Sequence, residues 1–172
     1  MSAIDAPEPD ESADGFTTAI NYPTPFNRYA VRLCQTASRY LNILSPALDH
    51  AVFDHEALAD AIGALVRRSQ QTQVRILVSD SRAVVVRGHR LLTLARRLPS
   101  KVQLQKLAEH PDWNNETIVI RDRNGVLYKP GGSDHDAFYE PDSRASTQRH
   151  LDRFNELWRL SAKDAELRSL TL

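Results

Sequence analysis

Two short polar clusters in the second half of the chain carry side chains that could do chemistry. Ser133-Asp134-His135-Asp136 offers carboxylates and an imidazole, which are ligands for divalent metal ions. His110 and Asp112 could serve as a general acid and a general base. Spacing places no further ligands beside the first cluster and no nucleophile beside the second. We therefore interpret both as polar loops, and predict no metal site and no cofactor.

The single cysteine, Cys34, lies on the apolar stripe of a helix predicted over 25–39. Burial there favours a core thiol over a nucleophile, because burial raises the thiol pKa and hides the sulfur. One cysteine excludes an internal disulfide and fits a reducing compartment. No apolar run approaches a membrane span and no secretory signal pattern opens the chain, so we expect a cytoplasmic protein without a membrane partner.

Charge is distributed unevenly although the formal net charge is +0. The first five acidic residues all precede the first basic one, Arg28, whereas seven Lys and Arg and no acid lie between Ser81 and Ala108. This basic stretch favours contact with phosphate or nucleic acid, and the alternative is a solvated helix face. A helix over 84–98 with its leucines toward a sheet would turn the basic side chains outward. The predicted polyanion-binding residues are His89, Arg90, Arg96, Arg97 and, from the next strand, Lys101.

The elements that position these residues follow from hydrophobic periodicity. The central unit, 72–107, is predicted as a strand, a helix and a strand, in a parallel crossover. Before it we expect a helix over 25–39, a strand over 40–45 and a helix capped by Asp54. After it we expect a hairpin turning at Asn124-Gly125, a loop over 130–142 and a helix over 143–160.

This order predicts an α/β fold with a mainly parallel mixed sheet flanked by helices. We expect one domain over 25–172, preceded by a disordered acidic arm over 1–24.

The element order and four stretches of sequence resemble one half of a phospholipase D-like superfamily protein. The stretches are RYLNILSPALD, QVRILVSD, GHRLLTLARRLPSKVQL and FNELW. A closer similarity is to an uncharacterised bacterial domain that is sometimes fused to N-acetyltransferases. The stretches that carry it are SDSRAVVVRGHRLLTLARRLPS, NGVLYKP and DAELRSLTL. The resemblance covers roughly 26–172 and implies the fold of a single phospholipase D-like half.

The chemistry of that superfamily uses the pattern H-x-K-x4-D, in which the His attacks phosphorus and the Lys holds phosphate oxygens. The matching positions here carry Asn115, Thr117 and Asp122, so only the Asp is retained. A carboxamide cannot form the phosphoryl intermediate, and a threonine supplies no fixed positive charge. The resemblance therefore implies a degenerate site without catalytic residues, in which Asp122 begins a turn.

Three functional hypotheses follow. The first is a non-catalytic binding or regulatory module that contacts nucleic acid or another phosphate-bearing ligand through the basic helix. The second is a protein-interaction domain that does not bind polyanions. The third, less favoured, is a hydrolase with a re-invented site around His110, Asp122 and His135. A single half is also compatible with a homodimer, because one-half members of the superfamily assemble their sites by dimerising.

Overall fold

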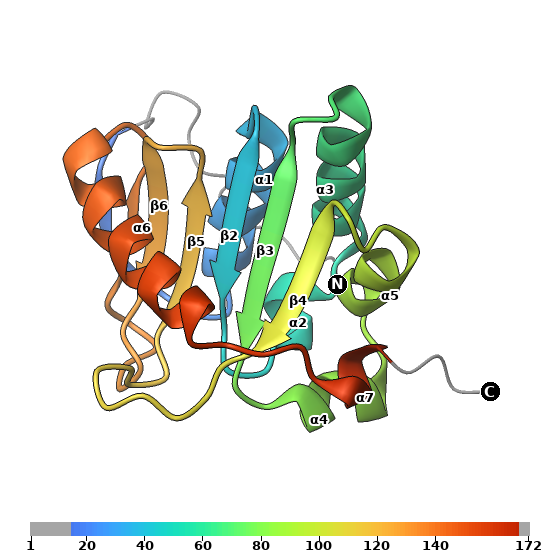
Figure 1. Cartoon of the computed structure of the whole chain (residues 1–172). Helices are drawn as coiled ribbons and strands as arrows, with labels where there is room; N and C mark the ends of the chain where they lie inside the picture. The colour runs from blue at the N-terminus through green and yellow to red at the C-terminus, as the bar shows by residue number, and fades with distance from the viewer. Residues whose placement is uncertain (1–14, 169–172) are drawn as a thin grey trace, which may run out of the picture.

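Seven strands form one mixed sheet in the order β1-β7-β6-β5-β2-β3-β4 (Figure 1). The computed structural model describes residues 15–168. The strands are β1 (Thr17–Ile20), β2 (Tyr40–Leu44), β3 (Gln73–Val78), β4 (Val102–Lys106), β5 (Thr117–Arg121), β6 (Gly125–Lys129) and β7 (Ala137–Glu140). The α/β class and the mixed sheet flanked by helices are confirmed. The parallel part is smaller than expected, because only β2, β3 and β4 run parallel and every other pairing is antiparallel.

Helices cover both faces of the sheet, but unequally. They are α1 (Phe26–Thr36), α2 (His50–Phe53), α3 (Glu56–Arg68), α4 (Ser81–Arg87), α5 (Arg90–Arg97), α6 (Arg144–Arg159) and α7 (Ala165–Arg168). Figure 1 shows α1 and α3 behind the sheet and α6 alone across its front, where it crosses β6 and β5 and leaves β3 and β4 uncovered. No helix within residues 15–168 is long and apolar enough to cross a membrane.

Two hydrophobic cores follow from the period-two alternation of the central strands. Leu41 and Ile43 of β2 belong to the larger core, which lies under α1, α3 and α5, whereas Leu44 belongs to the smaller core under α6. Cys34 is fully buried in the larger core, as predicted. Burial raises the pKa of its thiol to about 12.

The helix predicted over 84–98 is instead two helices that meet at Gly88 and His89. Gly88 has a φ of 75°, in the left-handed region that favours glycine. The Asp80 carboxylate accepts from the Ala83 N–H and caps α4. The ring of His89 accepts from the Leu91 N–H and caps α5. The break turns α5 relative to α4, so a single helical stripe cannot describe both.

Three further predictions differ from the structure. The arm predicted to be disordered up to residue 24 contains β1, which pairs with β7, a strand inside the predicted loop over 130–142. Both strands are four residues long, which is too short for alternation to distinguish them from loop. The acidic part of the arm, residues 1–14, lies outside the described residues. Asp54 does not cap α3, whose N-cap is His55.

Candidate functional site

The stretch that resembles the superfamily motif begins where β5 begins. Because β5 runs antiparallel to β2, its first residue, Thr117, lies at the carboxyl ends of β2, β3 and β4. We call this the motif edge. Asn115 lies just before the strand with a φ of 61°, a left-handed conformation that Asn adopts more readily than most residues. A Cβ at Gly131 would approach the backbone oxygen of Asn114 to 1.7 Å, so the two loops at this edge are in direct contact.

Lys129 brings an ammonium group beside the position of the missing motif lysine. It is the register partner of Thr117 across the antiparallel β5–β6 pair, so the two side chains emerge on the same face. Only 7% of Lys129 is exposed. Its Nζ lies 3.1 Å from Asp134 Oδ1, 3.0 Å from the Pro130 carbonyl oxygen and 5.0 Å from the centre of the Tyr22 ring. The ammonium group of Lys129 is therefore already paired with groups of the protein itself.

The segment before α1 closes over Lys129. The Tyr22 N–H donates to the Asp134 carbonyl at 2.8 Å, and the Tyr22 hydroxyl donates to the Asp49 carboxylate. Burial, the hydrogen bond and the charge of Asp49 raise the pKa of Tyr22. One residue earlier, Asn21 Oδ1 lies 3.0 Å from His135 Nδ1. The result is a neutral phenol and an internal ion pair on the α1 side of the motif edge.

The residue just before β5 is a buried acid that sequence reasoning missed, and it lies toward the opposite face of the sheet. Glu116 is 3% exposed, and Arg153 of α6 donates to its Oε1 at 2.7 Å. Burial, followed by the charge of Glu116, raises the pKa of Tyr128 to about 12. Burial lowers the pKa of the neighbouring His150. The available signal was that Glu116 shares the parity of the buried Ile118 and Ile120 and would need a cationic partner there.

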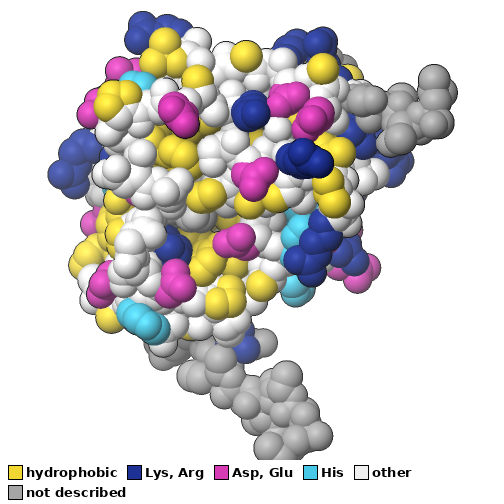
Figure 2. All heavy atoms as spheres, turned by 90° about the horizontal axis from the view of Figure 1, so that it is seen from below, with side chains coloured by type: hydrophobic (Ala, Val, Ile, Leu, Met, Phe, Trp, Pro, Cys, Tyr) yellow, Lys and Arg dark blue, Asp and Glu magenta, His cyan; other side chains and the backbone are white. Residues whose placement is uncertain are grey.

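A cleft of about 870 Å³ lies beside the motif edge. It is lined by Ser79, Lys106, Leu107, Ala108, Glu109, His110, Pro111, Trp113 and Asn115. The predicted acid–base pair does not form between side chains here, because His110 Nδ1 accepts from the backbone N–H of Asp112. Figure 2 shows the molecule from this end, where hydrophobic and acidic side chains occupy much of the middle and Lys and Arg lie mainly toward the rim.

Asp122 lies at the other end of β5, away from the motif edge. Its carboxylate accepts from the backbone N–H groups of Ser38, Arg39 and Tyr40, at 2.9, 2.8 and 2.9 Å. It therefore fixes the entry into β2 and is more than the first residue of a turn. The re-invented site is not assembled, since Asp122 is separated by the length of β5 from the loop that carries His110.

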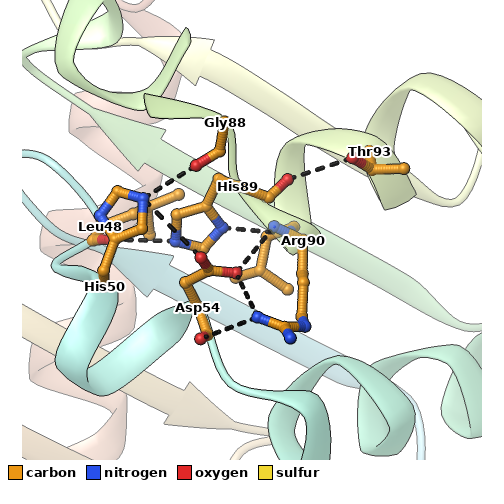
Figure 3. A network of polar contacts seen from close by, with 8 residues as sticks. Leu48, His50, Asp54, Gly88, His89, Arg90 and Thr93 are labelled. Atoms are coloured by element: carbon orange, nitrogen blue, oxygen red, sulfur yellow. Dashed lines mark hydrogen bonds and ion pairs between the residues drawn. The ribbon is translucent and has the colours of Figure 1, made fainter. Parts of the chain in front are cut away.

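His89, one of the predicted polyanion-binding residues, is buried and forms part of an internal network (Figure 3). It is 5% exposed, its Nε2 lies 2.9 Å from the Leu48 carbonyl oxygen, and its Nδ1 accepts from the Leu91 N–H at 3.0 Å. These contacts fit the neutral ring protonated on Nε2. Burial, which is the largest influence, lowers the pKa of His89. The prediction that His89 lies on the outer face is wrong, because the helix break turns it inward.

Three of the other basic residues have internal partners as well. Arg90 Nη1 pairs with Asp54 Oδ1 at 3.1 Å, and the Arg90 N–H donates to the same oxygen at 3.0 Å. Arg96 donates to the carbonyl oxygens of α7, at Leu167 and Glu166, and Lys101 donates to those of Ser69 and Gln70. Arg97 is exposed and forms no hydrogen bond or ion pair within residues 15–168. Polyanion binding by Arg90, Arg96, Arg97 and Lys101 stays a prediction.

The loop over 133–136 is held by its own side chains. Ser133 Oγ donates to Asp136 Oδ2 at 2.7 Å, Asp134 pairs with Lys129, and the His135 ring lies against Asn21. Across the described part of the chain, no group of three or more His, Cys, Asp and Glu is arranged to hold a metal ion.

With this geometry in view, solved structures identify the class of fold. TrmBL2, an archaeal chromatin protein whose structure is described as showing a novel mode of DNA binding, is 12% identical with a TM-score of 0.63, over 90% of this chain and 56% of that chain. Nuc from Salmonella typhimurium, described as a phospholipase D family member, is 13% identical with a TM-score of 0.59, over 87% and 95% of the two chains. NucT from Helicobacter pylori is 11% identical with a TM-score of 0.56, over 87% and 99%.

These likenesses show a phospholipase D-like fold. This chain spans little more than half the length of TrmBL2 and nearly the whole of Nuc. It belongs to the family described as "Domain of unknown function (DUF7931)", which matches residues 22–170. A comparison with curated proteins finds no significant match.

Proposed function

We propose that this protein is a non-catalytic binding module on a phospholipase D-like scaffold, with nucleic acid or another phosphate-bearing molecule as its ligand. The observation that carries the proposal is the state of the motif edge. Asn115 and Thr117 replace the nucleophile and the phosphate-holding lysine, and Lys129, the ammonium group beside them, is enclosed by Asp134 and Tyr22. Phosphoryl transfer needs a free cation and a nucleophile at one point, and the matching motif positions supply neither. Lys106 and His110 line the neighbouring cleft but lie outside those positions.

Two observations suggest what kind of ligand binds. One is the likeness to TrmBL2, which is described as binding DNA. The other is the exposed cationic side chain of Arg97, together with the partly available Arg90. Contacts of this kind would follow phosphates rather than read bases, so binding should weaken steeply with salt.

The catalytic half of the proposal is tested by hydrolysis. Purified full-length protein should release no product from a generic phosphodiester or from single-stranded and duplex nucleic acid above a buffer control. The alternative, a hydrolase with a re-invented site, predicts turnover above that control. Such turnover would overturn the non-catalytic reading.

The binding half is tested by fluorescence anisotropy with labelled RNA and DNA at low and physiological salt. Arg97→Glu is the cleanest variant, because Arg97 has no recorded internal partner, whereas Arg90→Glu would place two carboxylates together at Asp54. Arg149→Glu, an exposed position on α6, makes the same charge change elsewhere. We expect Arg97→Glu to weaken binding several-fold more than Arg149→Glu does. Equal binding by both variants, or none by the parent at low salt, would refute the polyanion ligand.

A protein partner is the second candidate. Val86 of α4 is 77% exposed, Phe16 is 62% exposed and Leu160, just after α6, is 49% exposed, so three large apolar side chains face solvent. Light scattering across concentration distinguishes the alternatives: a homodimer that Val86→Ser dissociates would favour an interaction domain. A monomer at every concentration would leave polyanion binding as the leading function.

A further inference from the structure

Arg75 lies on the front face of the sheet, at the border of the area that α6 covers. It occupies the middle of β3, between its register partners Asn42 on β2 and Gln103 on β4. Figure 1 shows that no helix crosses the front of β3 and β4. Gln73 and Gln105 emerge on the same face as Arg75. This uncovered part of the sheet therefore carries amides and a guanidinium, whereas a part packed under α6 would need apolar side chains.

The guanidinium of Arg75 is held in one orientation by neutral groups. Its Nε donates to Asn42 Oδ1 at 2.8 Å and its Nη2 donates to Asn155 Oδ1 at 2.7 Å. Its central carbon lies 5.1 Å from the Phe154 ring centre and 5.4 Å from that of Trp158. Asn42 is itself buried. The side chain is therefore fixed before any ligand arrives, which lowers the entropic cost of binding.

What Arg75 lacks is a counter-charge. No carboxylate within residues 15–168 forms an ion pair with it, and both of its recorded hydrogen-bond acceptors are uncharged amides. A guanidinium has five N–H donors, so three remain after these two bonds. Half-burial without a counter-charge also lowers the pKa of Arg75. A fixed, partly desolvated cation with spare donors is complementary to an oxyanion.

A small pocket of about 240 Å³ lies over this guanidinium. It is lined by Tyr40, Asn42, Gln73, Arg75, Asp122, Arg123, Leu151 and Asn155. We call it the Arg75 pocket. Its one carboxylate, on Asp122, is already engaged by three backbone N–H groups, and a second guanidinium, on the exposed Arg123, lies at its margin. Positive charge and amide donors therefore outweigh the single acid.

We propose that the Arg75 pocket binds a small oxyanion, a phosphate or carboxylate group, through the fixed fork of Arg75 with Arg123 as a second cation. The volume is below that of typical sites for drug-sized ligands. It suits one anionic group with a small substituent. The pocket lies at the amino ends of β2 and β3, whereas the motif edge lies at their carboxyl ends. Oxyanion binding here therefore goes beyond the proposed function and does not depend on it.

The test uses the full chain, with inorganic phosphate and acetate as separate probes. NMR or thermal-shift titrations at constant ionic strength, balanced with chloride, should give a saturable response in the millimolar range or tighter. Saturation by phosphate alone assigns a phosphate site, and saturation by acetate alone assigns a carboxylate site. Absence of a saturable response to both probes overturns the proposal.

Two variants locate the response. Asn155→Asp places a carboxylate where Asn155 Oδ1 now accepts from Arg75, so it should raise thermal stability without ligand and weaken anion binding at least about tenfold by occupying the cation. Arg123→Gln should weaken binding several-fold and leave folding intact, because Arg123 is exposed. Arg159→Gln, exposed at the end of α6, is the matched control and should bind as the parent does. Parental binding by both Asn155→Asp and Arg123→Gln would refute the site even if phosphate binds elsewhere. These readouts involve no nucleic acid and no hydrolysis, so failure here is distinguishable from failure of the proposed function.

Discussion

Replacing Asp122 tests whether the one retained motif residue is structural. Its Oδ1 accepts from Arg39 and Tyr40 and its Oδ2 from Ser38, which ties the end of β5 to the start of β2. The residue also adopts a φ of 50°, in the left-handed region. Asp122→Ala removes all three acceptor contacts and places an unsuitable residue in that conformation.

The magnitude follows from how exposed the three donors are. The bond to Tyr40 is partly buried, and a hydrogen bond to a charged group of this kind contributes about 2 kcal/mol. The two exposed donors can turn to water, so together they contribute about 1 kcal/mol. Left-handed backbone at alanine adds about 1 kcal/mol. We therefore expect Asp122→Ala to lower the free energy of unfolding by about 4 kcal/mol.

Asp122→Asn separates these contributions. Asparagine tolerates the left-handed conformation and keeps the oxygen that accepts from Arg39 and Tyr40, so we expect a loss of only about 1 to 2 kcal/mol. Urea unfolding followed by circular dichroism measures both variants, with the exposed Asp60→Ala of α3 as control. The reasoning is refuted if Asp122→Ala lies within about 0.5 kcal/mol of the Asp60→Ala control, the range expected for an ordinary surface change.

Three further predictions use other parts of the structure. The folded chain holds the pKa of His89 below its ordinary value, so near and below pH 6.5 the unfolded chain binds more protons. The contribution of the neutral His89 to the free energy of unfolding should therefore be fully present above about pH 6.5 and be lost as the pH decreases. His89→Asn keeps a helix cap and should flatten this pH dependence, as measured by urea unfolding at about pH 7.5 and 5.5. Cys34 should react with a thiol reagent at mildly alkaline pH only after urea unfolding, because the sulfur is buried; rapid native labelling would contradict the packing. Restoring the motif with Asn115→His and Thr117→Lys should produce no diesterase turnover and lower thermal stability, since His would take a φ of 61° and the new Lys would face Lys129. Turnover by that double variant would show that the edge lacks only two side chains.

Much of the fold was predictable because its long elements have strong periodicity. The helical spacing around Leu33 and Cys34 and the short apolar run of β3 predict elements within a few residues of α1 and β3. Asn124-Gly125 correctly marks the β5–β6 hairpin. The short strands β1 and β7 were not predictable, because four residues carry too little pattern and their stability comes from pairing with each other. The break at Gly88 was visible as a glycine but not as a change of helix direction.

The sequence by itself determined which side-chain types stand at the positions that resemble the superfamily motif. Side-chain type decides whether a group can attack phosphorus or hold a phosphate, so the prediction drawn from Asn115 and Thr117 needs no coordinates. Tertiary structure alone decided which cations remain available. His89 is turned inward against Leu48, and Lys129 is enclosed, because pairing register and helix direction depend on contacts between distant segments.

The same reason explains why the Arg75 pocket was absent from the sequence analysis. Asn42 lies 33 positions from Arg75 in the chain and Asn155 lies 80 positions from it. Period-two alternation could place Arg75 on one face of β3, but it could not say that α6 ends beside that face. Only the packing of α6 on the sheet brings the two amides to one guanidinium and leaves Arg75 on the lining of a pocket.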